Sequence, residues 1–322
     1  MRDRRSATTR LQYIDMHRYF IVTVYRFLFE GGKCSAVTIH PYDGQIAVLT
    51  TMHGKEEAIA APFRQILGVQ LIVPEGLNTD TLGTFSREVE REHSALDTLR
   101  LKVKMGLEMT GEKLGVGTEA SFGPDPMIPF IARHHEMMLW RDDLNGIEVV
   151  EQMSTHQTNY EQVTLDRVDE SLTDFLHRVQ FPSHKVIVMP NVADEPGLIF
   201  KGISDLMALE SQIRRCIQHS KDGQALVQTD MRAMMNPTRM RVISELAERL
   251  AKRLLRRCDQ CASPGWGYVD VQRGLPCEQC GRPTQLISST IEGCPSCDHQ
   301  LLVAREDGLQ FASAAHCNWC NP

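Results

Sequence analysis

The chain has 322 residues and a formal net charge of −6, with 42% hydrophobic and 24% charged residues. These values are typical of a globular protein with one large domain or two smaller ones, and they exclude a disordered or fibrous chain. The acidic balance argues against general attraction to nucleic acid or anionic lipid, so any site for a polyanion must be a local patch.

Residues 1–40 are interpreted as an N-terminal extension. Several arginines precede an apolar run from Tyr19 to Phe29, and Arg26 interrupts this run. The run is shorter than the roughly 18 apolar residues needed to span a membrane, and no convincing cleavage site follows it. We therefore expect an amphipathic extension or a strand here, and no association with a membrane.

Residues 41–235 predict an α/β domain whose mixed, mainly parallel sheet is flanked by helices. The apolar run Ile46–Leu49 predicts a buried strand, Glu57–Leu67 a helix, and Val69–Val73 a second strand, which together form a βαβ opening. A further helix is expected from about Ser86 to Met109, ending at Gly111.

The next segment predicts a short strand that breaks into a loop rich in glycine and proline. The strand and loop together run from Leu114 to Pro126, and the loop would carry Glu119 and Ser121 near its tip. Two strands should follow, joined by Asn145 and Gly146, because Asn-Gly is a strong hairpin signal. A hairpin implies an antiparallel part of the sheet. The remaining predicted elements are the helix Leu172–Val179, the strand Lys185–Met189, the helix Ile203–His219 and the strand Ala225–Thr229.

Residues 236–257 predict a basic connecting helix. Asn236 is a suitable cap and Pro237 a suitable first-turn residue. The cations favour a contact with nucleic acid, but they also fit a solvated helix face that complements the helix dipole. They are Arg239, Arg241, Arg249, Lys252, Arg253, Arg256 and Arg257.

Residues 258–322 predict a double zinc-ribbon module, because they contain four CxxC pairs. The pairs are Cys258/Cys261, Cys277/Cys280, Cys294/Cys297 and Cys317/Cys320. Two pairs supply the four thiolates of one tetrahedral, structural Zn²⁺, so four pairs predict two such sites. The spacing permits sequential pairing, first with second and third with fourth, and nested pairing, second with third and first with fourth. Thiolates that bind metal indicate a reducing compartment, so we expect a cytoplasmic protein.

A set of polar residues in the first half of the domain predicts a phosphate site. In a βαβ fold, strand ends and helix starts converge on one edge of the sheet. Lysines beside a glycine turn suit phosphate oxygens, and carboxylates suit Mg²⁺ and an attacking water. The candidate substrate-binding residues are Lys55, His53, Lys102 and Ser121, and the candidate catalytic residues are Asp80, Glu88 and Glu119. The alternative is that these residues are solvated charges and caps.

From about Pro41 to Pro322 the chain resembles a bacterial family known as a domain of unknown function. The resemblance is carried by Met52–Glu56, Asp80–Phe85, Glu88–Arg91, Ser121–Pro124, Phe181–His184, Thr229–Ala233, Asn236–Met240, Gly274–Cys277 and Cys320–Pro322. Two positions depart from the family pattern: Glu119-Ala120-Ser121 stands in place of Ser-Glu-Gly-Ser, and Asp125 stands in place of histidine.

A second resemblance is to the pyrophosphohydrolases of inosine and xanthosine triphosphates. It is carried by the turn that ends at Lys55, by Thr84-Phe85 with Glu88, and by the loop that contains Glu119. The resemblance implies that Lys55 holds phosphate, Glu88 binds Mg²⁺ and Glu119 helps to activate water. His53 stands where that family has asparagine.

These observations predict a Mg²⁺-dependent hydrolase of a nucleotide or another phosphorylated small molecule. The alternative is a binding module without catalysis, in which the basic helix and the zinc ribbons contact nucleic acid or a protein. The two predictions differ in whether the residues from Lys55 to Glu119 form a site.

Overall fold

The computed structural model describes residues 25–30, 33–38, 40–52, 54–77, 93–193 and 198–322. The chain divides into two compact units, which are described separately. The central unit comprises Gly44–Asp143 and Val150–Leu250, and the terminal unit comprises Met1–Asp43, Leu144–Val149 and Ala251–Pro322. The division at residues 40, 235 and 257 stays a prediction.

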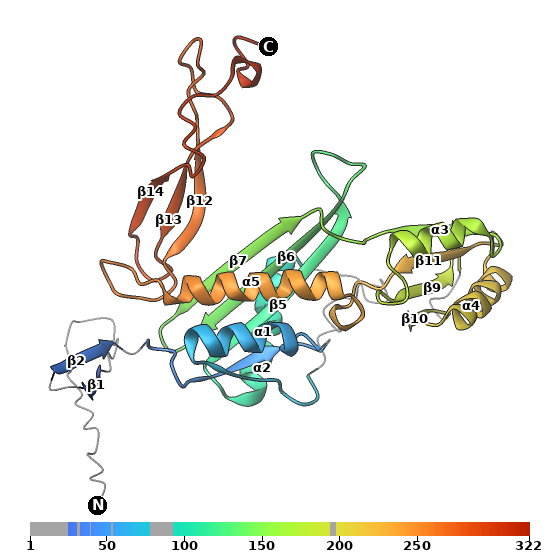
Figure 1. Ribbon diagram of the computed structural model, residues 1–322, viewed down its shortest axis with the longest axis horizontal. Helices are drawn as coiled ribbons and strands as arrows, with labels where there is room; N and C mark the ends of the chain where they lie inside the picture. Colours follow the sequence, from blue (N-terminus) through green and yellow to red (C-terminus); the bar gives the residue numbers. More distant parts are fainter. Residues whose placement is uncertain (1–24, 31–32, 39, 53, 78–92, 194–197) are drawn as a thin grey trace, which may run out of the picture. The chain divides into compact units, whose positions relative to one another are not determined.

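A five-stranded mixed sheet, as expected, has the strand order β4-β3-β5-β6-β7, and the central unit contains β3 to β6 and β7 from Val150 onward (Figure 1). β3 is parallel to both β4 and β5, whereas β6 is antiparallel to β5. The strands are β3 (Ile46–Thr50), β4 (Gln70–Ile72), β5 (Leu114–Pro124), β6 (Ala132–Asp142) and β7 (Ile147–Thr155). The predicted strand, helix and strand opening is confirmed: β3 leads into α1 (Glu56–Pro62) and a π-helical turn η1 (Phe63–Leu67), and then into β4.

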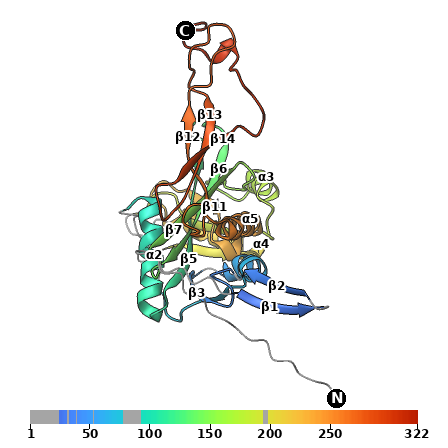
Figure 2. The same cartoon turned by 90° about the vertical axis from the view of Figure 1, so that its left-hand side faces the viewer.

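Helices cover both faces of this sheet, which explains why its strands are apolar on both sides. On one face, Val48, Met137 and Leu139 pack against α2 (Ala95–Thr110), which is seen beside the sheet in Figure 2. On the other face, the ring of Trp140 lies 5.7 Å from that of Phe63 in η1. Because η1 directly continues α1, α1 and α2 lie on opposite faces of the sheet.

The helix α2 begins later than its apolar pattern predicted. Ser94 caps it by accepting a hydrogen bond of 3.1 Å from the backbone N–H of Asp97, and the left-handed Gly111 ends it as expected. Residues 78–92 lie outside the described part of the chain.

The loop expected near Glu119 and Ser121 is instead part of a long strand. β5 pairs with β6 residue by residue, from Leu114 opposite Asp142 to Pro124 opposite Ala132. The partner strand satisfies the backbone along this whole length, so the glycines do not break it. The Asn145-Gly146 turn between β6 and β7 is confirmed, with Gly146 at φ +65°.

The central unit also holds a second sheet, which is antiparallel throughout, with the order β10-β9-β11-β8. Its core includes Phe175 from α3, Leu209 from α4 and Val188 from β9. The bounds are β8 (Gln162–Leu165), α3 (Glu170–Arg178), β9 (Val186–Pro190), β10 (Phe200–Ile203), α4 (Leu206–His219) and β11 (Ala225–Thr229). The sequence predicted most of these elements but did not separate the two sheets.

The helix α5 (Pro237–Leu255) follows a short 3-10 turn, η3 (Ala233–Met235). The Asn236 cap is confirmed, since its Oδ1 accepts a hydrogen bond of 3.0 Å from the backbone N–H of Arg239. Apolar residues from Ile243 to Leu254 are buried on one face of the helix, as the periodicity predicted.

The terminal unit contains the antiparallel sheet β12-β13-β14 and the hairpin of β1 and β2. The bounds are β1 (Tyr25–Glu30), β2 (Lys33–Thr38), β12 (Gly267–Arg273), β13 (Ile287–Gly293) and β14 (Gln300–Ala304), with a 3-10 turn η4 (Ala314–His316).

Candidate functional site

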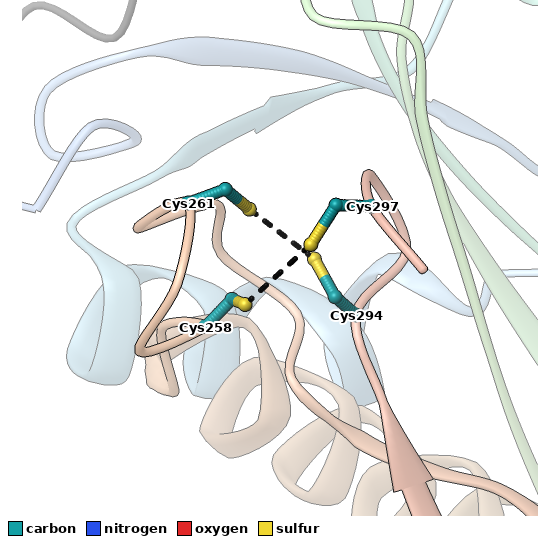
Figure 3. Close-up of side chains that lie close together, drawn as sticks. All are labelled: Cys258, Cys261, Cys294 and Cys297. Atoms are coloured by element: carbon teal, nitrogen blue, oxygen red, sulfur yellow. Dashed lines mark hydrogen bonds between the residues drawn. The ribbon is translucent and has the colours of Figure 1, made fainter. Parts of the chain in front are cut away.

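One cysteine quartet lies at the beginning of β12 and the end of β13. It consists of Cys258, Cys261, Cys294 and Cys297, whose sulfurs all lie within 4.8 Å of one another (Figure 3). The Sγ atoms of Cys258 and Cys297 are 3.8 Å apart, and those of Cys261 and Cys294 are 3.5 Å apart. Zn–S bonds of about 2.3 Å in a tetrahedron place sulfurs about 3.8 Å apart, so the quartet fits a zinc ion.

The second quartet consists of Cys277, Cys280, Cys317 and Cys320. Its Sγ separations are 3.9 Å between Cys277 and Cys320 and 3.7 Å between Cys280 and Cys317. Backbone N–H groups of Cys320 and Trp319 lower the pKa of Cys317 to about 7, whereas the hydrogen bond with Cys280 raises the pKa of Cys320 to about 12, so Cys317 forms a thiolate more easily than Cys320. In the described residues, two groups could therefore hold a structural metal ion each, as predicted.

The pairing of the CxxC motifs is neither sequential nor nested: the first pairs with the third and the second with the fourth. The sheet explains this interleaved arrangement. In the antiparallel β12 and β13, Gly267 lies opposite Gly293, and Arg273 lies opposite Ile287. The first and third motifs therefore meet at one end of the sheet, because they precede β12 and follow β13. β14 then carries the chain to the opposite end, where the second and fourth motifs meet.

The polar site in the central unit lies where β3 ends and β5 continues beyond it. Lys55 follows β3, and its Nζ donates hydrogen bonds of 2.6 Å to Thr118 Oγ1 and 3.4 Å to Thr118 O on β5. The Lys55 residue is 7% exposed. Burial, followed by the charge of Arg239, lowers the pKa of Lys55 to about 7.

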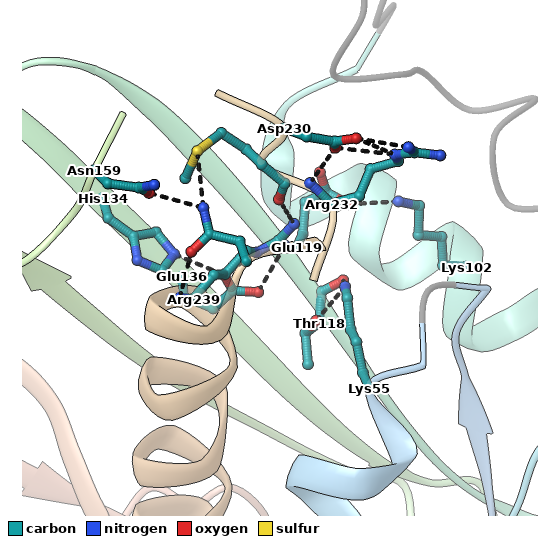
Figure 4. A network of polar contacts seen from close by, with 12 residues as sticks. Lys55, Lys102, Thr118, Glu119, His134, Glu136, Asn159, Asp230, Arg232 and Arg239 are labelled. Atoms are coloured by element: carbon teal, nitrogen blue, oxygen red, sulfur yellow. Dashed lines mark hydrogen bonds and ion pairs between the residues drawn. The ribbon is translucent and has the colours of Figure 1, made fainter. Parts of the chain in front are cut away.

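Lys102 of α2 reaches the same part of β5, where its Nζ lies 2.5 Å from Glu119 Oε2 (Figure 4). Both side chains are largely buried. Since Thr118 and Glu119 are consecutive in a strand, their side chains point to opposite faces of the sheet. Lys55 therefore approaches β5 on the face opposite to Lys102, although Lys102 and Glu119 still act electrostatically on Lys55.

One other predicted site residue, Ser121, lies in the described part of the chain, and it does not contact this group. Ser121 lies further along β5, opposite His135 of β6, and is exposed. His53, Asp80 and Glu88 lie outside the described residues. The structure thus brings Lys55, Lys102 and Glu119 to one stretch of β5, on two faces rather than one.

A buried ionic cluster that sequence reasoning missed lies on the Lys55 face. Glu136 of β6 accepts two hydrogen bonds of 3.1 Å from Arg239 of α5 and lies 2.8 Å from His134 Nε2 (Figure 4). Burial raises the pKa of Glu136, but the opposing charge of Arg239 and the contact with His134 lower it to about 2. Glu136 is therefore a carboxylate at neutral pH.

Further hydrogen bonds link this cluster to the start of α5. Arg239 Nη1 donates to Met231 O at 2.6 Å, and Asn236 Nδ2 donates to Asn159 Oδ1 at 2.8 Å. Next to it, Asp230 accepts hydrogen bonds from Arg232. Two signals in the sequence point to Arg239: it lies in the motif Asn236–Met240, and it is four residues before Ile243 on the apolar face of the helix.

Part of the positive charge of the basic helix is buried or paired. Arg239 is buried against Glu136, and Arg253 is buried with its Nε donating to Gly265 O at 3.1 Å. Arg256 forms an ion pair with Glu292. Arg249 and Lys252 are exposed. Over the described residues, no helix has the length and apolar character required to cross a membrane.

The fold and its sites define a mixed α/β protein with two four-cysteine groups that could each hold a metal ion. The chain belongs to the family described as "domain of unknown function (DUF6671)", which matches residues 102–322. A comparison with curated proteins found no match, and so none to the pyrophosphohydrolases of inosine and xanthosine triphosphates.

Proposed function

We propose that the central unit binds a nucleotide or another phosphorylated small molecule where β3 ends beside β5. The observation that carries this proposal is the crossover at this point. From β3 the chain passes through α1 to β4 on one side, and then through α2 to β5 on the other side, with the two helices on opposite faces. Open α/β sheets bind ligands at the carboxyl ends of strands at such a switch point.

The charges at this switch point support an anionic ligand. Lys55 and Lys102 reach it from the two faces of the sheet, and Arg239 adds a third cation on the Lys55 face. Glu119 and Glu136 already hold Lys102 and Arg239. Of the three cations, Lys55 has no carboxylate at ion-pairing distance among the described residues. A phosphate oxygen would give its ammonium an opposite charge in addition to the two hydrogen bonds to Thr118.

The reaction we propose is Mg²⁺-dependent hydrolysis that uses Asp80, Glu88 and Glu119. Glu119 is paired with the ammonium of Lys102, and the groups of described residues that could hold a metal ion consist of cysteines. The described residues therefore do not form a Mg²⁺ site by themselves. The Mg²⁺ part of the proposal therefore depends on Asp80 and Glu88.

A nucleotide panel tests this function. Purified protein with Mg²⁺ or Mn²⁺ should release phosphate or pyrophosphate from at least one nucleoside triphosphate, and Glu88→Gln should abolish the release. Glu108→Gln is the matched control, because Glu108 is exposed on α2 and pairs only with Lys104 among the described residues. If wild-type protein releases neither product, or if Glu88→Gln retains full activity, the hydrolase proposal is rejected.

The two cysteine quartets have a structural role in this proposal. Four thiolates complete the coordination of a zinc ion and leave no position for substrate. Reduced thiolates of this kind also support the cytoplasm as the compartment of the protein.

A second candidate function is a binding module for nucleic acid or protein, favoured by the exposed Arg249 and Lys252 on α5. Phosphate contacts would make binding of a DNA or RNA duplex weaken with salt. The double variant Arg249→Ala/Lys252→Ala should then lower the affinity and reduce the salt dependence. If the wild type and the double variant bind with the same affinity and this affinity does not change with salt, binding of nucleic acid through this face is rejected.

A further inference from the structure

The amine of Lys55 is buried without an acidic partner in the described part of the chain. Its hydrogen bonds go to a hydroxyl and a carbonyl oxygen, both of Thr118. The ammonium form of a buried lysine is costly unless an opposite charge lies within a few ångströms. The amine of Lys55 therefore lies in a site that favours its neutral form.

Charged groups from four neighbouring elements act on this amine. Arg239 of α5 and Lys102 of α2 disfavour the ammonium, whereas Glu136 of β6 and Glu119 of β5 favour it. Each acid is already in contact with another cation: Glu136 with Arg239, and Glu119 with Lys102. Together with burial, which is the largest effect, these charges bring the pKa of Lys55 to about 7.

A phosphate group at the switch point would change this balance. A dianion within about 4–6 Å of an amine favours the ammonium and raises its pKa. The proton would come from solvent, so that the neutral amine and one proton become an ammonium when the anion binds. The binding of the anion and the binding of the proton would then strengthen each other.

We propose that Lys55 takes up a proton when a phosphate group binds beside β5, so that anion binding is coupled to protonation. This inference rests on the proposed phosphate site. It adds that the site gains a positive charge, on Lys55, when the anionic ligand binds. Uptake should approach one proton per site at pH 8 and fall toward zero at pH 6. Affinity for an anion of constant charge should weaken by up to about tenfold for each pH unit above 7.

Isothermal titration calorimetry with the full chain tests the coupling. The probes are inorganic sulfate, whose charge is constant between pH 6 and 9, and adenosine triphosphate at pH 8. Titrations in two buffers that differ in their heat of ionisation give the number of protons taken up. Lys55→Arg should remove the uptake, because a guanidinium stays charged, whereas Lys104→Arg on the exposed face of α2 should leave the uptake unchanged.

The outcomes separate this inference from the proposed function. Binding by wild-type protein with uptake near one proton at pH 8 and little at pH 6 supports the coupling. Binding without uptake, or with equal uptake at both pH values, overturns the coupling and leaves the phosphate site in place. If neither probe binds, both proposals fail. The wild-type titrations decide these points even if Lys55→Arg does not fold.

Discussion

Glu136 on β6 and Arg239 on α5 form a buried ion pair with two hydrogen bonds of 3.1 Å, although 103 residues separate them in the chain. Neither side chain is accessible to solvent. His134 and the backbone carbonyl of Met231 provide further partners. The pair thus joins the first turn of α5 to the five-stranded sheet of the central unit.

Removing one partner of this pair should destabilise the protein strongly. Glu136→Gln leaves the Arg239 guanidinium without its opposing charge, and such changes reduce the free energy of unfolding by about 3–5 kcal/mol. Urea denaturation followed by circular dichroism measures the change, with Glu108→Gln on the exposed face of α2 as the control. A loss below about 1 kcal/mol, the range of exposed pairs, would show that the pair is hydrated in solution.

The stability of the protein should depend on pH through Lys55. Its folded pKa of about 7 lies below the ordinary value of 10.5, so the unfolded chain binds more protons between these two values. The penalty for burying Lys55 is therefore complete below about pH 7 and becomes smaller as the pH rises toward 10.5.

Lys55→Met removes this penalty, so it should raise the melting temperature more at pH 6 than at pH 9. Thermal melts of the wild type and the variant at both pH values measure the difference. Lys104→Met, at an exposed position, is the control. The same increase at both pH values would contradict a lowered pKa for Lys55.

Paired cysteine substitutions should report the interleaved metal sites. Cys258→Ser/Cys294→Ser removes two ligands of one quartet, so the chain should retain one zinc ion in the other quartet. Cys258→Ser/Cys277→Ser damages both quartets and should retain none. Zinc content per chain after dialysis measures this. Retention by the second variant and loss from the first would instead demonstrate sequential pairing.

Two glycines of β5 should differ in their tolerance of alanine. A Cβ at Gly117 would lie 2.6 Å from Thr50 Oγ1 and 2.8 Å from Val103 Cγ2, whereas a Cβ at Gly123 meets nothing within 4 Å. Gly117→Ala should lower the free energy of unfolding by about 1–3 kcal/mol through overpacking between β3, β5 and α2. Gly123→Ala, in the same strand, should change it little. Equal effects in denaturant titrations would refute the close packing of α2.

Features that depend on nearby residues were determined by the sequence alone. The apolar runs predicted the opening strand, helix and strand, Asn145-Gly146 predicted the hairpin, and Asn236 predicted the cap of α5. The CxxC spacing identified all eight cysteines of the two groups that could hold a metal ion. Each of these signals lies within a few residues of the feature it specifies. The hydrogen bonds of a turn or a helix cap join residues that are near one another in the sequence, and the same is true of the two cysteines of one CxxC motif.

Features that depend on strand register were decided only by the tertiary structure. The length of β5 follows from its pairing with β6, so the segment predicted as a loop is a strand. In this strand, Thr118 and Glu119 point to opposite faces of the sheet. The order of β12, β13 and β14 determined which CxxC motifs meet. The contact of Arg239 with Glu136 required a helix and a strand far apart in the chain to pack together. A side chain's own residue type sets its chemistry, but the register and crossover of distant strands set its neighbours.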